Sequence, residues 1–301
     1  MSQEDTFKTR ARVGFAKGEE YDQYRPTYSP TIVQLLLDNL QVNGKQHAKI
    51  LDLAAGTGKF TEAVAAREEQ FEIVAVEPHE KMRGVLAGKE LRGVTVKDGK
   101  ADAIPLPDAS VDAVICAQAF HWFATKPALQ EIHRVLKRHG HLGMVWNIED
   151  YNAPQGHKAK TTWEAKAHDL IWSFNDEDPR FRHEKWREVF DEQVKSSPLS
   201  LLPSGDDEQF FSLPLGEQQE AFETWLPKEK IWDRFNTLSH IAVLEGEERE
   251  KTYKTFMEAL NSPDTETDGE GRVAVHGTTF AVWTSKIPAE GRDELADVER
   301  Q

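Results

Sequence analysis

Hydrophobic and polar positions change their spacing along the chain, and these changes divide it into segments. Residues 1–14 are mostly polar, which predicts a flexible N-terminal tail. A helix is expected after Ser29, which suits the N-cap, with Pro30 in its first turn and apolar residues at helical spacing behind it. From residue 49 to residue 146 short apolar runs alternate with helix-compatible segments. Residues 15–150 are therefore predicted to form one core.

The alternating stretch predicts a layered fold. Its apolar runs are expected to be strands, and the segments between them have the composition and length of helices. Alternation of strand and helix implies a mostly parallel sheet with helices on both faces, so the predicted class is α/β and Rossmann-like. The expected strands are 50–53, 73–76, 94–96, 111–116 and 142–146, and the expected helices are 60–67, 80–88 and 127–138.

The second half of the chain loses this alternation. It holds six of the eight tryptophans among many charged residues, and we expect helices around Trp163 and Trp186 and two or three more within 217–260. Residues 151–270 are therefore predicted to form a mostly helical insert or lid that shapes a substrate pocket. Residues 271–286 alternate like a strand that returns to the sheet, and 287–301 are expected to be a solvated tail.

Composition and charge narrow the possible functions. The 301 residues are 39% hydrophobic, as in a globular protein, and their net charge of −15 repels phosphate backbones and anionic membranes. We therefore expect neither nucleic acid nor membrane as a partner. Cys116 is the single cysteine, which excludes an intrachain disulfide and fits a reducing compartment. Without a long apolar run or a secretory signal pattern, a cytoplasmic location is expected.

A glycine turn joins the first predicted strand to the next helix in the motif ILDLAAGTG at 50–58. Such a turn lets backbone N–H groups approach a ligand closely. Glu77 ends the next predicted strand, where a carboxylate can accept hydrogen bonds from both hydroxyls of an adenosine ribose. A dinucleotide fold would place a third glycine where this chain has Thr61, and Asp52 suits an amino group and a sulfonium better than a pyrophosphate. This favours S-adenosylmethionine, with an NAD(P)-dependent oxidoreductase as the weaker alternative.

Five motifs occur in order along the chain: YDQYRP at 21–26, LDLAAGTGKFT at 51–61, VAVEP at 74–78, ADAIPLPDASVDAV at 101–114, and AQAFHWF followed by EIHRVLKRHGHLGMVWN at 117–147. Together they resemble the class I S-adenosylmethionine-dependent methyltransferases, in particular the branch of ubiquinone/menaquinone-type and trans-aconitate-type enzymes. The sequence looks most similar to microbial and fungal members with the AFHWF signature. The resemblance covers residues 12–150 and implies a seven-stranded sheet and direct in-line methyl transfer to a small molecule. A non-catalytic S-adenosylmethionine-binding regulatory protein remains the alternative.

The resemblance also implies which residues hold the cofactor and the acceptor. The methionine loop would be Asp52, Ala54, Gly56 and Gly58, the ribose would be held by Glu77, the adenine would lie between Ala101 and Asp102, Gln118 would lie near the sulfonium, and Tyr24 with Arg25 would close over the carboxylate. Residues expected around the acceptor are Tyr21, Phe120, His121, Trp122 and Trp146. For the tyrosines and the aromatic residues ordinary packing remains an alternative. A strand-end cap is the alternative for Asp52, and a surface carboxylate is the alternative for Glu77.

Three further expectations concern chemistry. His121 is the candidate catalytic base, because an imidazole that titrates near neutrality can take a proton from an acceptor hydroxyl; a wall or structural histidine is the alternative. The aromatic residues of 151–270 suit a flat or apolar acceptor, whereas Arg180, Arg182 and Lys185 suit an acid. No metal site is expected, because the histidines at 133, 139 and 141 lack a convincing ligand spacing. The protein is expected to be a monomer or a homodimer.

Two positions depart from the family pattern. Ala54 replaces the first glycine of the usual loop, which is tolerable only if its φ is negative. Lys100 stands where many relatives place an acidic residue toward the adenine amino group. The adenine partner therefore stays open, with Asp102 as a substitute.

Overall fold

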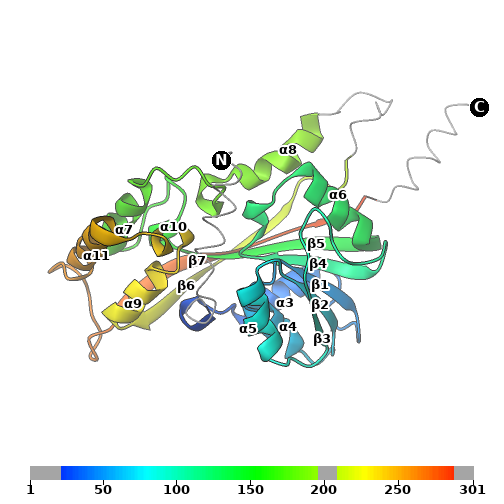
Figure 1. Ribbon diagram of the computed structural model, residues 1–301, viewed down its shortest axis with the longest axis horizontal. Coiled ribbons are helices and arrows are strands. Elements are labelled where there is room, and N and C mark those ends of the chain that lie inside the picture. The colour runs from blue at the N-terminus through cyan, green and yellow to red at the C-terminus, as the bar shows by residue number, and fades with distance from the viewer. Residues whose placement is uncertain (1–21, 196–208, 288–301) are drawn as a thin grey trace, which may run out of the picture.

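The strands and helices predicted between residues 49 and 146 are present in the computed structural model, which describes residues 22–195 and 209–287. They build an α/β fold around a seven-stranded sheet with the order β3-β2-β1-β4-β5-β7-β6 (Figure 1). Strands β1 to β5 pair in parallel, and β7 runs antiparallel to both β5 and β6. The strands are β1 (Lys49–Leu53), β2 (Glu72–Val76), β3 (Val94–Lys97), β4 (Val111–Ala117), β5 (Leu136–Glu149), β6 (Gly216–Leu226) and β7 (Val273–Ser285).

The helices begin at the caps that the sequence supplies. Ser29 accepts a hydrogen bond from the backbone N–H of Ile32, 3.1 Å away, and Pro30 opens the helix α3, as predicted. The helices are α3 (Pro30–Asn39), α4 (Lys59–Ala65), α5 (Glu80–Gly88), α6 (Lys126–Val135), α7 (Thr162–Trp172), α8 (Glu188–Lys195), α9 (Lys228–Phe235), α10 (Ser239–Ala242) and α11 (Gly246–Leu260), with short 3-10 turns η1 (Phe120–Trp122), η2 (Asp150–Asn152), η3 (Phe181–His183) and η4 (Lys185–Arg187).

Two apolar clusters cover the two faces of the sheet. On one face Leu36 of α3 packs with Val64 of α4 and with strand residues such as Ile50. On the other face Leu129 of α6 and Phe190 of α8 pack against the same strands. The central strands are therefore buried on both sides, which is the environment that parallel sheets require.

Strands β5, β7 and β6 lie at one side of the sheet and extend past the other strands (Figure 1). A second group of helices, α7 and α9 to α11, lies along this extension (Figure 1). A third apolar cluster joins these helices to the strands, with Trp163 of α7, Phe235 of α9, Phe256 of α11 and Val275 of β7 among its members. The helix expected around Trp163 is thus confirmed. Of the range 217–260, where two or three helices were expected, residues 228–260 hold α9, α10 and α11. These helices pack against the same seven-stranded sheet as the core, at β7 and near the end of β5.

The range 217–260 was expected to hold helices, and for residues 217–226 this expectation is wrong, because they belong to strand β6. Their Glu, Gln and Ala residues favour a helix, but eleven residue pairs with β7 decide the conformation. Phe222 lies over Gly277 of β7 so closely that a Cβ on this glycine would collide with its ring. Helix α6 also ends earlier than predicted, at Val135, because Leu136 to Arg138 already belong to β5.

The predicted terminal tails lie outside the described residues, apart from Ile287. Tyr21, a predicted acceptor residue, lies outside them as well. In the two described ranges, 22–195 and 209–287, no helix combines the length and the apolar character that a membrane span needs.

Candidate active site

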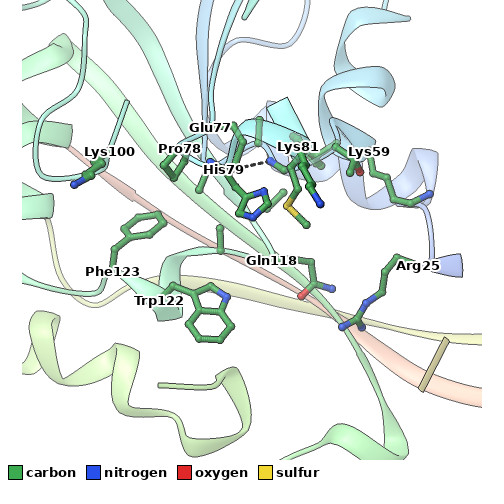
Figure 2. Close-up of a pocket in the computed structure, with 18 of the residues that line it drawn as sticks. Arg25, Lys59, Glu77, Pro78, His79, Lys81, Lys100, Gln118, Trp122 and Phe123 are labelled. Carbon is green, nitrogen blue, oxygen red and sulfur yellow. Dashed lines mark hydrogen bonds between the residues drawn. The ribbon is translucent and has the colours of Figure 1, made fainter. Parts of the chain in front are cut away.

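A cavity of about 780 Å³ opens at the carboxyl ends of β1, β2 and β4. In open α/β sheets, this edge is where ligands bind. Figure 2 shows its lining, which comes from the loops after these strands and from the segment before α3. Predicted cofactor residues that line it are Arg25, Ala54, Gly56, Glu77 and Gln118.

Glu77 is the central carboxylate of this cavity. Its Oε2 accepts a hydrogen bond from the backbone N–H of Gly56 at 2.8 Å, and its Oε1 accepts one from the backbone N–H of His79 at 2.7 Å. Burial raises the pKa of Glu77, while these two N–H groups lower it again. Each oxygen is thus fixed in place and keeps a second lone pair for a ligand hydroxyl.

The loop after β1 contains a backbone strain that the sequence analysis did not expect. Ala54 has a φ of +58°, so the expectation of a negative φ is wrong. A left-handed alanine costs roughly 1–2 kcal/mol, because its Cβ approaches the following carbonyl oxygen. Gln118, at the end of the neighbouring strand β4, also has a positive φ, of +57°. Both residues line the cavity. Strained backbone conformations of this kind concentrate at binding and active sites.

Gly58 does not line the cavity, and its role differs from the predicted one. It caps α4 with a φ of +85°, and a Cβ added to it would collide with Cδ1 of Leu86 in α5. The glycine is therefore needed for a turn and for the close approach of α4 to α5. Gly56, with a φ of +59°, has only Met82 Sδ near its missing Cβ, at 3.9 Å, and does line the cavity.

Asp52 lies below the loop, with its side chain buried and outside the cavity wall. Thr61, which stands where a dinucleotide fold has its third glycine, donates its hydroxyl to Oδ2 of Asp52 at 2.6 Å. Oδ1 of Asp52 is buried and has no hydrogen-bond partner among the described residues. Burial, with a smaller contribution from the charge of Glu77, raises the pKa of Asp52 to about 7.

The two ends of the cavity differ in chemistry. Lys100 and Phe123 lie at one end, close to Pro78, and Arg25 and Lys59 lie at the other (Figure 2). The first end thus offers an aromatic ring and one cationic side chain, and the second offers two cationic side chains. Burial lowers the pKa of Lys59.

A second cavity of about 60 Å³ adjoins the first, and Arg25, Gln118 and Trp122 line both. The rest of its wall comes from the end of β5, from η1 and η2, and from the segments around η3 and α10. These residues are His121, Asn147, Ile148, Asn152, Arg180, Phe181, Arg182, Leu238, Ser239 and His240.

His121 lies in this second cavity with one ring nitrogen already engaged. The indole N–H of Trp146 donates to Nδ1 of His121 at 3.0 Å. Burial, followed by the charges of Arg180, Arg182 and Arg25, lowers the pKa of His121 well below its usual value. The ring is therefore neutral, and its proton lies on Nε2, which makes Nε2 a donor. This arrangement does not support the role of a general base.

Comparison with known proteins assigns the chain to a family. A family model described as a methyltransferase domain matches residues 51–144. Two Schizosaccharomyces pombe proteins, an uncharacterized methyltransferase-like protein and an uncharacterized methyltransferase, are each 34% identical to the chain. The matches span 79% and 81% of this chain and 82% and 85% of those proteins. The chain belongs to the methyltransferase family.

The fold of this methyltransferase is shared with solved structures. The YcgJ protein of Bacillus subtilis superposes on it with a TM-score of 0.50 and 17% identity, over 86% of this chain and 99% of that one. At this identity the likeness concerns the fold alone. It agrees with the seven-stranded sheet described above.

Several predicted site residues of the methyltransferase lie away from both cavities. Tyr24 packs against α9, where Arg234 Nε donates to its carbonyl oxygen at 3.0 Å. Asp102 is exposed, and Ala101 packs against the core. Phe120 stacks on Phe190, and Trp146 is fully buried. Asp52, Gly58, Phe120 and Trp146 are thus buried behind the walls rather than lining them.

The lining residues that the sequence analysis did not assign include Lys59, His79 and Lys81. A signal existed for Lys59, which directly follows the glycine motif. Phe123, expected among the aromatic walls, does line the cavity. Lys100, noted as a departure from the family pattern, does line the cavity.

Proposed function

We propose that the chain is an S-adenosylmethionine-dependent methyltransferase with a small-molecule acceptor. Beyond family membership, the observation that supports this most is the carboxylate of Glu77, held by two backbone N–H groups at the wall of a large cavity. A fixed carboxylate at the end of β2 is suited to the two hydroxyls of a ribose.

The remaining walls fit the other parts of the cofactor. Phe123 and Pro78 would enclose the adenine at the end where Lys100 lies. Arg25 and Lys59 would hold the carboxylate of the methionine moiety at the opposite end, as two cations there suit an anion. When bound, S-adenosylmethionine supplies a methyl group that its sulfonium already activates for transfer.

The protein's contribution is alignment and exclusion of water. Gln118 donates from Nε2 to the carbonyl oxygen of Asn147 at 2.6 Å, which fixes its amide where the two cavities meet. Trp122 closes the same boundary with an apolar face. Holding two reactants in line supplies up to about 7–11 kcal/mol of the barrier reduction. His121, neutral and engaged by Trp146, serves in this proposal as a positioning residue and not as a base.

Asp150 and His276, two further side chains able to act as a base, lie outside both cavities. Asp150 accepts the backbone N–H of Lys160 at 2.8 Å, and His276 is held between Glu164 and Glu223. We therefore infer that the acceptor needs no general base from these residues. The trans-aconitate- or ubiquinone-type branch, the cytoplasmic location and the monomeric or homodimeric state stay predictions from the sequence.

Calorimetric titration with S-adenosylhomocysteine, S-adenosylmethionine and NADH tests the cofactor. We expect saturable heat with the two sulfur compounds and none with NADH; the reverse pattern would overturn the proposal. Incubation with methyl-labelled S-adenosylmethionine and a metabolite extract then tests turnover. Cofactor binding without any labelled product from broad acceptor panels would favour a regulatory protein over an enzyme.

A further inference from the structure

The second cavity is chemically unlike the first. Its wall contains three guanidinium groups, from Arg25, Arg180 and Arg182, and no carboxylate side chain. Asn152 and Ser239 add polar groups. At about 60 Å³, and with roughly 10–15 Å³ of such space needed for one water, it has room for a group of about four heavy atoms.

The arginines are fixed before any ligand arrives. Arg180 Nε donates to Asp176 Oδ2 at 2.8 Å, and Arg182 Nη2 donates to the same oxygen at 2.6 Å. Arg180 also donates to the hydroxyl of Ser239, and its guanidinium lies 4.6 Å from the centroid of the Trp122 ring. Both arginines are buried, with 7% and 4% of their surface exposed. Such pre-ordering lowers the entropy cost of binding an anion.

The two arginines share Asp176, and Arg180 Nη2 also donates to Asp178 Oδ2 at 2.9 Å. Arg25 Nη1 lies 3.8 Å from Glu149 Oε2. The carboxylates that pair with these arginines therefore lie outside the cavity lining.

Burial, with a smaller contribution from the charge of Arg180 and against the opposing charge of Asp176, lowers the pKa of Arg182 to about 10. Arg182 Nε is buried without a hydrogen-bond partner among the described residues. After burial itself, the causes that lower the pKa of His121 are the charges of Arg180, Arg182, Arg25 and His183. Apart from burial, the groups that act most on His121 are thus positively charged.

We propose that the second cavity binds a carboxylate of the methyl acceptor, with Arg180 and Arg182 as the residues that select an acidic substrate. The proposal rests on the proposed function, because it places the acceptor beside the cofactor cavity. The carboxylate is an anchor and is not the methylated atom. The rest of the acceptor passes Gln118 and Trp122, which line both cavities, toward the cofactor. The proton on His121 Nε2 makes this ring a further donor on the same wall.

A neutral analogue fits this cavity poorly. An amide in place of the carboxylate brings N–H groups toward guanidinium groups that are themselves donors only. Charge-assisted and bidentate pairs between arginine and carboxylate are roughly twice as strong as neutral hydrogen bonds. The arrangement therefore selects acids over their amides of nearly equal size.

The test uses the full chain saturated with S-adenosylhomocysteine, whose own affinity is measured first by calorimetry. Thermal unfolding is then followed with sodium acetate, acetamide or inorganic phosphate as probes, at constant ionic strength set by sodium chloride. We expect saturable stabilisation by acetate and none by acetamide. Stabilisation by phosphate but not by acetate would assign the cavity to a phosphate group and overturn the carboxylate.

Two variants locate the effect. Arg182→Gln removes a charge, and Asn152→Asp adds one where Asn152 Oδ1 already accepts a hydrogen bond from Arg182 Nη1 at 3.2 Å. The second change keeps size and partner, so the fold is retained even if the first variant is unstable. Each should weaken acetate binding at least tenfold and leave S-adenosylhomocysteine affinity within twofold. Arg187→Gln, at an arginine that pairs with Glu217 and lines neither cavity, is the matched control and should keep both affinities.

The outcomes separate the two proposals. No binding of S-adenosylhomocysteine to the wild type would remove the proposed function itself. Retained cofactor binding with acetate stabilisation that is absent, or equal in wild type and Asn152→Asp, would overturn the carboxylate anchor alone.

Discussion

Trp146 donates its indole N–H to Nδ1 of His121 across 3.0 Å, and both side chains are buried. The two residues come from β5 and η1, and the bond decides where the imidazole proton lies. His121 thus presents a donor to the second cavity instead of a basic lone pair.

The first prediction follows from this bond. His121→Asn keeps an acceptor for Trp146, and we expect kcat to fall less than tenfold while KM for the acceptor rises. Loss of a general base would typically cost about 10²–10⁴ in rate. Because the pKa of His121 lies well below 6.5, the wild-type rate should show no acid limb between pH 6 and 8 that the variant lacks. The pH profiles of kcat for both proteins decide the point, and a limb near pH 6.5 that vanishes in the variant would restore the base.

Glu77→Gln tests the ribose assignment. The amide replaces one accepting oxygen by a donor that faces a backbone N–H, so S-adenosylhomocysteine should bind about 5- to 150-fold more weakly, the scale of 1–3 kcal/mol. Calorimetry measures the change. Asp102→Asn is the control at an exposed carboxylate and should bind within twofold of the wild type. Equal affinities for wild type and Glu77→Gln would place the ribose elsewhere.

Gly58→Ala should lower the free energy of unfolding and leave the contacts with the cofactor unchanged. Its Cβ meets Leu86 at a φ of +85°, and we expect the free energy of unfolding to fall by about 1–3 kcal/mol. Urea unfolding of Gly58→Ala, Leu86→Ala and the double variant should show a double-variant loss smaller than the sum of the two. An alanine variant with wild-type stability and no affinity for S-adenosylhomocysteine would return Gly58 to the cofactor wall.

Because Ala54 is strained, glycine substitutions at Ala54 and at Ala55 should change the free energy of unfolding in opposite directions. Ala54→Gly relieves a φ of +58° and should raise the free energy of unfolding by up to about 1 kcal/mol. Ala55→Gly, at the adjacent residue in the same wall, has no positive φ to relieve and should lower it by about 0.5–1 kcal/mol. Denaturant midpoints compare the two variants, and equal shifts in one direction would contradict the strain.

The raised pKa of Asp52 should make the free energy of unfolding depend on pH. Its pKa is raised from 3.8 to about 7, so the folded protein binds more protons than the unfolded chain between these values. The free energy of unfolding therefore falls as pH rises through this window, and the contribution is lost above about pH 7. Asp52→Asn should gain up to about 4 kcal/mol relative to wild type between pH 4 and 8, at 1.36 kcal/mol per pKa unit. Urea unfolding at pH 5 and 8 measures it, and parallel pH curves would show that Asp52 does not titrate in this way.

Local signals predicted most of the core correctly. Ser29 and Pro30 mark a helix start through bonds within one turn, and the loop between β1 and α4 follows from its glycines. Glu77 was found because its place at the end of a strand fixes its position relative to the neighbouring loop. Such features involve residues close in the chain or in adjacent parallel strands, and the periodicity of the sequence reports them.

The sequence by itself determined the parallel core, the glycine loop and the position of the Glu77 carboxylate beside that loop, because strand ends of a parallel sheet meet at one edge. Only the tertiary structure decided that residues 216–226 form β6, since pairing with β7 outweighs their helical propensity. It also decided the second cavity, where Arg180 meets Ser239 and His121 meets Trp146. Contacts between residues so far apart in the chain, and the proton positions they impose, depend on packing that no local pattern records.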